Sequence, residues 1–137
     1  MQNIVIDTSV AMKWFFPETG FKKALELKDK QIKNEISIYS RDLFIYEFTS
    51  AFRNHSSVEI EKKDFSLAVS ALMSLKIKFL PLKFQETTEL FLLSKKLNIS
   101  IYDGSFVLLA RKLKAPLYTA DKKLFVKGKD IVEMVLI

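Results

Sequence analysis

The stretch NIVID at residues 3–7 decides the fold, because it is a short β-branched run that ends in a carboxylate. The following segment, VAMKWFF at 10–16, predicts a short helix that Pro17 ends. Outward from this pair, the alternation of strand and helix continues along the chain. We expect strands at 36–40, 77–82, 116–120 and 130–136, and helices at 20–33, 42–54, 59–76, 84–97, 102–114 and 122–126. Strands separated by helices predict an α/β fold with a mainly parallel sheet covered on both faces.

Length and composition indicate one globular domain that spans residues 1–137. The chain is 49% hydrophobic and 28% charged, and it contains no cysteine. The lack of cysteine excludes a disulfide framework and a thiolate metal site. His55 is the single histidine, which excludes a multi-histidine metal site and disfavours a Ser–His–Asp triad. A bound metal would therefore have oxygen ligands, as magnesium and manganese prefer.

The net charge of +6 comes from 19 lysines and 3 arginines against 16 acidic residues. Such a balance suits a polyanionic partner, and it also suits a lysine-rich surface that only meets solvent. The amino-terminal residues do not resemble a signal peptide, and no apolar run is long enough to span a membrane. We therefore expect a cytoplasmic protein without a membrane partner.

Three carboxylates follow predicted strands or begin predicted helices. Asp7 closes the first strand, and Asp121 follows the strand at 116–120. In open parallel sheets the binding crevice lies beyond the carboxyl ends of the strands. Either aspartate could instead cap the next helix. Asp103 comes three residues after Ser100, a spacing that resembles a capping box.

Glu47 occupies an unusual position on the predicted helix at 42–54. On a wheel of about 100° per residue, the polar arc holds Asp42, Tyr46, Thr49 and Arg53. The opposite arc holds Leu43, Phe44, Ile45, Phe48, Ala51 and Phe52. Glu47 falls between Leu43 and Ala51, where an unpaired carboxylate would cost several kcal/mol or become protonated. A buried ion pair with a lysine or a bound metal ion would each explain it.

The four carboxylates of Asp7, Glu47, Asp103 and Asp121 could meet in one crevice. Without a cation they would repel one another and raise one another's pKa. A divalent ion would remove that repulsion, lower the pKa of a bound water and stabilise the leaving oxygen of a phosphodiester. The four residues are therefore candidates for both metal binding and catalysis.

Three blocks of the chain resemble the signature regions of PIN-domain ribonucleases. These blocks are VIDTSVAMKWFFPE at 5–18, LFIYEFTSAFR at 43–53 and SIYDGSFVLLARKLKAPLYTADKKL at 100–124. The resemblance is strongest to the VapC-like toxins of type II toxin–antitoxin modules. It covers nearly the whole chain, in the order of the family.

The resemblance implies a three-layer α/β/α sandwich and a magnesium- or manganese-dependent endoribonuclease that cleaves RNA. It also implies a cognate antitoxin that masks the site, and a homodimer. Asp7, Glu47, Asp103 and Asp121 match the four acidic positions of the family. The hydroxyls of Thr8, Ser9 and Thr119 stand at positions that support the metal's water shell or orient a carboxylate.

Other residues carry weaker expectations. Candidate phosphate contacts are Lys13, which follows the first block most closely, Arg41, Arg53 and Arg111. We expect Trp14, Phe15 and Phe16 to pack in the core or at the antitoxin interface, with stacking on RNA bases as the alternative. For Tyr102 we expect core packing and not stacking on substrate, and we expect His55 to lie in a loop without a catalytic role. Gly104 stands where alanine is commoner in the family, which suggests a looser helix start.

Three alternative functions compete with the toxin. A housekeeping PIN-type nuclease would process RNA without an antitoxin. A receiver-like signalling domain also binds magnesium at strand ends, but it needs an acidic pair after the first strand, and Asp7 follows Ile6. A catalytically inactive nucleic-acid-binding relative would have no need to keep all four acids.

Overall fold

The computed structural model describes residues 1–55 and 59–137. Strands and helices alternate through these ranges, as the sequence predicts. The strands are β1 (Gln2–Ile6), β2 (Ile36–Arg41), β3 (Lys78–Leu80), β4 (Leu117–Thr119) and β5 (Met134–Leu136). The helices are α1 (Thr8–Phe15), α2 (Phe21–Ile32), α3 (Leu43–Arg53), α4 (Lys62–Ser74), the 3₁₀ turn η1 (Phe84–Glu86), α5 (Thr87–Leu97), α6 (Ile101–Leu113) and α7 (Lys122–Gly128). The predicted α/β class is confirmed.

The five strands form one parallel sheet in the order β3-β2-β1-β4-β5. The chain builds outward from β1 through β2 to β3, then crosses to the other side of β1 to form β4 and β5. The strand order therefore reverses between β1 and β4, where Val5 pairs with Leu117. A crevice is expected beyond the carboxyl ends of these two strands, where Asp7 and Asp121 follow them.

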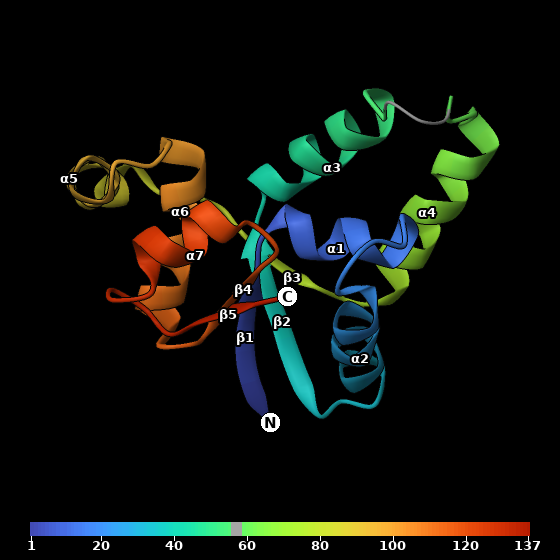
Figure 1. Ribbon diagram of the computed structural model, residues 1–137, viewed down its shortest axis with the longest axis horizontal. Coiled ribbons are helices and arrows are strands. Elements are labelled where there is room, and N and C mark those ends of the chain that lie inside the picture. Colours follow the sequence, from blue (N-terminus) through green and yellow to red (C-terminus); the bar gives the residue numbers. More distant parts are fainter. Residues whose placement is uncertain (56–58) are drawn as a thin grey trace.

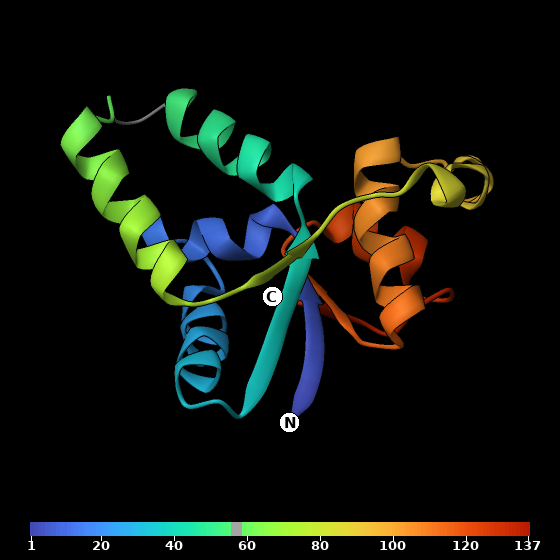
Figure 2. The ribbon, with the colours of Figure 1, turned by 180° about the vertical axis from the view of Figure 1, so that it is seen from behind.

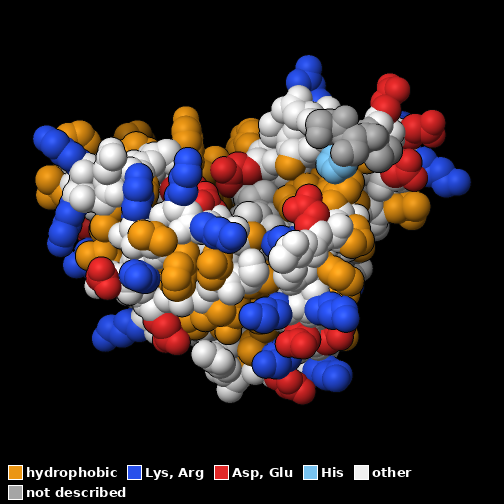
Figure 3. Space-filling model, viewed as in Figure 1, with side chains coloured by type: hydrophobic (Ala, Val, Ile, Leu, Met, Phe, Trp, Pro, Cys, Tyr) orange, Lys and Arg blue, Asp and Glu red, His pale blue; other side chains and the backbone are white. Residues whose placement is uncertain are grey.

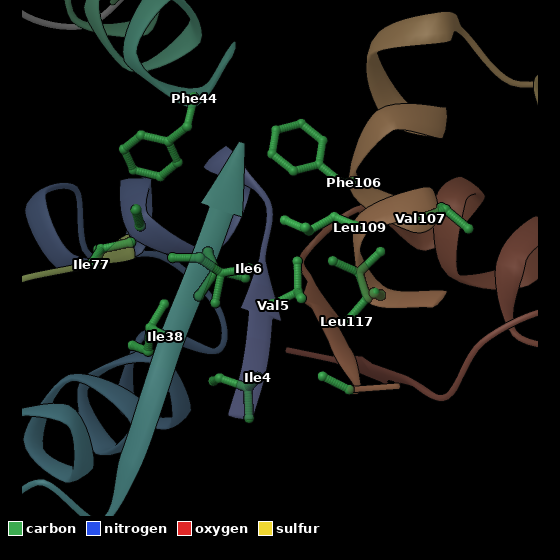
Figure 4. Packing of buried hydrophobic residues seen from close by; sticks show 14 of the residues in the cluster. Ile4, Val5, Ile6, Ile38, Phe44, Ile77, Phe106, Val107, Leu109 and Leu117 are labelled. Atoms are coloured by element: carbon green, nitrogen blue, oxygen red, sulfur yellow. The ribbon is translucent and has the colours of Figure 1, made fainter. Parts of the chain in front are cut away.

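Helices cover both faces of the sheet and make three layers. Figure 1 and the reverse view in Figure 2 place α1, α2 and α4 on one side of the strands, and α5, α6 and α7 on the other. The central strand is buried on both faces, with Val5 and Ile6 fully enclosed. Figure 4 shows Phe44 of α3 and Phe106 of α6 on either side of the carboxyl end of β2, with Val5 and Ile6 below them. In the described part of the chain, no helix is both long enough and apolar enough to cross a bilayer.

Phenylalanine rings join α1, α3 and α4 on one side of the sheet. The ring of Phe48 lies 5.6 Å from that of Phe15 and 4.8 Å from that of Phe52, measured between centroids. Phe16 stacks on His55, directly after the end of α3. These contacts confirm that Phe15 and Phe16 pack against the core. They also hold α3 against α1, so that α3 has a defined position beside the carboxyl end of β1.

The expectation of a loose helix start at Gly104 is wrong, because α5 and α6 pack very closely at this residue. A Cβ atom on Gly104 would lie 2.1 Å from Ser94 Oγ and 3.1 Å from Leu90 Cδ1. Gly104 is buried, and so is the Ser94 side chain that faces it. The glycine is therefore required by packing between two helices.

We expect Gly104→Ala to destabilise the fold by about 1–3 kcal/mol, because overpacking outweighs alanine's gain in helix propensity. In the Ser94→Ala background the clashing oxygen is gone, and the same change should cost little. Urea unfolding of the wild type, the two single variants and the double variant measures this coupling. Ser66→Ala, on the exposed face of α4, is the control background and should give no relief. An equal cost of Gly104→Ala in all backgrounds would contradict the packing explanation.

Candidate metal and nuclease site

Asp7 is the most buried carboxylate of the candidate site, with 6% of its surface exposed. It caps α1 by accepting a hydrogen bond from the Ser9 amide at Oδ1. The Ser9 hydroxyl donates to the same oxygen at 2.5 Å, and the Thr119 hydroxyl donates to Oδ2 at 2.5 Å. Burial raises the pKa of Asp7 to about 6, although both hydroxyls favour the ionised form. The nearby charge of Asp103 contributes to this rise in pKa.

The same hydroxyls connect Asp7 to the segment that carries Asp121. The Asp121 amide donates to Thr119 Oγ1 at 3.0 Å, and the Ala120 amide donates to Ser9 Oγ at 2.9 Å. The carboxylate of Asp121 accepts from the amides of Lys123 and Leu124 through Oδ1, so that it caps α7. Asp121 therefore caps a helix while it also lies beside the Asp7 cluster.

Glu47 joins the cluster through Thr8, whose hydroxyl donates to Glu47 Oε1 at 2.7 Å. The sequence placed Glu47 inside the apolar arc of α3 and included Ile45 in that arc. In the structure the buried stripe consists of Phe44, Phe48 and Phe52, Glu47 is half-buried at its edge, and Ile45 is exposed. Burial raises the pKa of Glu47, and the charge of Asp103 adds to the rise. The partner of Glu47 is thus a hydroxyl and not a lysine.

Asp103 connects the four acids electrostatically. It lies half-buried in the first turn of α6, where its amide donates to the Ser100 hydroxyl at 3.0 Å. Burial raises the pKa of Asp103, and so does the charge of Asp121. Because Asp103 also raises the pKa of Asp7 and Glu47, its carboxylate lies within electrostatic range of all three others.

The donor set fits a hard divalent cation. It offers four carboxylates and three hydroxyls, and within residues 1–55 and 59–137 none of the four acids forms an ion pair with a lysine or arginine. Over the same ranges, no three acidic or histidine side chains already lie close enough to hold one ion. Without a cation, the carboxylates repel one another, which favours a wider separation between them. A bound cation would draw them together. The residues that could hold it are Asp7, Glu47, Asp103 and Asp121.

Two basic residues considered as phosphate contacts have other roles. Lys13 is buried in the last turn of α1, where its ammonium donates to the Thr19 carbonyl. Arg41, at the end of β2, is 2% exposed and donates to the carbonyls of Ser105 at 2.9 Å and Pro81 at 3.2 Å. Neither cation is presented to a substrate. Arg41 instead ties the end of β2 to the helix that carries Asp103, a role that the sequence analysis missed.

The expectation that Tyr102 packs in the core is also wrong, because its side chain is 63% exposed. Tyr102 directly precedes Asp103 in the first turn of α6, and the exposed Tyr46 directly precedes Glu47 on α3. Figure 3 shows the molecule hollowed between α6 and α3, with acidic side chains in the notch. An exposed tyrosine therefore directly precedes each of two candidate carboxylates, Asp103 and Glu47.

The chain belongs to the PIN domain family, whose sequence pattern it matches over residues 4–129. PIN domains are nucleases. Family membership confirms the resemblance seen in the sequence and removes the receiver-like alternative. A comparison with curated proteins finds no match.

Solved structures share the fold at low sequence identity. The protein PAE2754 from Pyrobaculum aerophilum has a TM-score of 0.65 and 20% identity, over 97% of this chain and 90% of that one. A chain of FitAB bound to an IR36 DNA fragment has a TM-score of 0.68 and 15% identity, over 97% and 94%. A chain of VapBC-5, a toxin–antitoxin system of Mycobacterium tuberculosis, has a TM-score of 0.60 and 15% identity, over 100% and 98%.

The raised pKa of Asp7 predicts a pH-dependent stability cost in the metal-free protein. Its folded pKa of about 6 lies above its ordinary value of 3.8, so ionisation favours the unfolded chain as pH rises between these values. In chelator above about pH 7, Asp7→Asn should therefore be more stable than wild type by about 1–3 kcal/mol. The gain should disappear near pH 4, where folded Asp7 is protonated.

Urea unfolding across this pH range measures the difference between the two proteins. Asp29→Asn is the matched control, because it makes the same change at an exposed position in the last turn of α2. A stability difference between Asp7→Asn and wild type that stays constant with pH would mean that the buried charge carries no cost.

Proposed function

We propose that this PIN domain is a magnesium- or manganese-dependent endoribonuclease. The observation that carries the proposal is the electrostatic coupling of four carboxylates, from four distant segments, with no cation of the described chain to neutralise them. Such a cluster is costly unless a divalent cation compensates it. Membership of a nuclease family supports cation-dependent phosphodiester hydrolysis as the use of that site.

Each residue of the cluster has a distinct part in this proposal. Asp7, Glu47, Asp103 and Asp121 are the catalytic carboxylates and the metal ligands. Thr8 orients Glu47 by donating to one of its oxygens, while Ser9 and Thr119 orient Asp7 from both sides. A bound divalent ion would supply the charge that activates water and stabilises the leaving oxygen. The protein's own contribution is to hold ionised oxygens that would otherwise repel one another.

Removal of one carboxylate should abolish RNA cleavage without unfolding the chain. We expect Asp7→Asn and Glu47→Gln each to lower kcat/KM by roughly 100-fold or more, while Asp29→Asn keeps wild-type activity. Chelation should stop the wild-type reaction, and added manganese or magnesium should restore it. Gel assays of end-labelled RNA measure all of these rates. If Asp7→Asn cleaved RNA at the wild-type rate, the activity would belong to another site or to a contaminant.

The role of Thr8 can be tested separately from that of the ligands. Thr8→Val removes the hydrogen bond to Glu47 but keeps the shape of the side chain, and we expect a loss of about 10–100-fold in activity or metal affinity. Thr8→Ser keeps the hydroxyl and should recover most of it. Manganese titration followed by electron paramagnetic resonance gives the affinity without reference to turnover. Equal behaviour of the two variants would argue against an orienting hydroxyl.

We further propose that the nuclease is the toxin of a toxin–antitoxin pair and acts as a homodimer. The fold shared with VapBC-5, a toxin–antitoxin system, and with the DNA-bound FitAB assembly supports this assignment. A small open reading frame beside the gene should encode a protein that co-purifies with the chain and inhibits it. An isolated gene would favour the housekeeping RNA-processing role. Light scattering of the purified protein measures its oligomeric state.

A further inference from the structure

A hollow of about 460 Å³ runs along the exposed side of α3 and begins at the candidate site. It is lined by Tyr46, Glu47, Ser50, Ala51 and Asn54. Because Glu47 also belongs to the carboxylate cluster, the hollow continues the crevice. At a rise of about 1.5 Å per residue, Tyr46 and Asn54 lie about 12 Å apart along the helix axis. The hollow is thus a strip that leads away from the site, long enough for part of an extended strand.

The chemistry of this strip suits nucleobases. The ring of Tyr46 is 77% exposed, so one of its faces can receive a planar partner. Stacking on an aromatic ring tolerates any base and is a common way to hold single-stranded RNA. Apart from Glu47, the side chains that line the strip are uncharged: the ring of Tyr46, the methyl of Ala51, the hydroxyl of Ser50 and the amide of Asn54. The lining residues themselves include no lysine or arginine, although Arg53 lies beside the strip and donates to Asn54. Contacts to bases are therefore the use that the lining suits best.

The amide of Asn54 is held in one orientation by its neighbours. Its Nδ2 donates to Ser50 Oγ at 3.2 Å, and its Oδ1 accepts from Arg53 Nη1 at 3.1 Å. A side-chain amide has two N–H donors and two carbonyl lone pairs. With respect to the described residues, one donor and one lone pair of Asn54 therefore remain for a ligand. An adjacent donor and acceptor in a fixed orientation can recognise the edge of an unpaired base.

We propose that the strip along α3 binds unpaired bases of the RNA beside the scissile phosphate, with Tyr46 stacking on one base and Asn54 recognising another. The proposal rests on the nuclease function, which it makes more specific. RNA would enter as a single strand, because a base in a duplex cannot present its face to Tyr46. Cleavage would then occur in loops or unpaired segments, with a nucleotide preference that depends on Asn54.

Binding of RNA can be measured apart from its cleavage. In the Asp7→Asn background, fluorescence anisotropy with short, unstructured, fluorescein-labelled oligoribonucleotides gives the Kd. Tyr46→Ala should weaken binding about 5- to 150-fold, the equivalent of one stacked base, and Tyr46→Phe should keep most of the affinity. Phe91→Ala removes another exposed ring, on α5, and should leave the Kd unchanged. Removal of the exposed Tyr46 ring leaves no cavity, so the fold should remain intact.

Sequence preference is the second measurement. A random single-stranded RNA library is cleaved by the wild type and, separately, by Asn54→Ala, both with Asp7 intact, and the cleaved ends are sequenced. Asn54→Ala should show a different nucleotide preference beside the cut. Metal-dependent cleavage combined with wild-type binding by Tyr46→Ala and an unchanged preference in Asn54→Ala overturns the base subsite and leaves the nuclease intact. The base subsite is also overturned if Tyr46→Ala weakens binding of the co-encoded partner protein but not binding of RNA. Failure of the wild type to cleave any RNA overturns the nuclease, and the subsite with it.

Discussion

The burial of the Asp7 carboxylate is the constraint on which the rest of the site depends. Asp7 follows the central strand of the sheet, so it cannot reach water without leaving the end of β1. The protein compensates part of the cost with three donors, two from Ser9 and one from Thr119. These donors do not replace a positive charge, because burial still raises the pKa of Asp7 to about 6. The site is therefore prepared for a cation that the described chain does not supply.

Helix capping and metal binding are compatible uses of the same residues here. Asp7 caps α1 and Asp121 caps α7, while Asp103 lies in the first turn of α6. The amino ends of these three helices carry the cluster, and each contributes a partial positive charge and backbone amides that donate to side-chain caps. A carboxylate is thus stabilised at each position before a metal binds. This explains how acids that repel one another can share one end of the sheet at a tolerable cost.

The sequence was sufficient for features that depend on local pattern. The alternation of strands and helices and the positions of Asp7 and Asp121 at the ends of parallel strands all follow from periodicity. Features that depend on contacts between distant segments could not be predicted. Nothing near Gly104 in the sequence indicates that Ser94 of another helix touches it, and Arg41 resembles any other charged residue at a strand end.

The position of Glu47 could be predicted only in part, because it depends both on the local helical pattern and on contacts with a distant segment. A helical wheel could show that the residue lies close to the apolar stripe, but the width of the buried face depends on how α3 packs against α1. Phe48 and Phe52 contact Phe15 of α1, and with Phe44 they form the buried stripe of α3. Glu47 lies at the edge of this stripe, within reach of Thr8. Glu47 is therefore more accessible than the buried Asp7, although both are proposed ligands of the same cation.

The distribution of charge suggests a division of labour in substrate binding. The chain as a whole is basic, at +6, and attracts a polyanion, whereas the crevice concentrates four carboxylates and repels phosphate. In the proposed function, a phosphodiester would therefore approach the carboxylates only with a cation present. The proposed base contacts along α3 do not share this restriction, because stacking on Tyr46 needs no positive charge. The basic surface would attract the RNA, the strip along α3 would align its bases, and the cation would admit the phosphate that is to be cleaved.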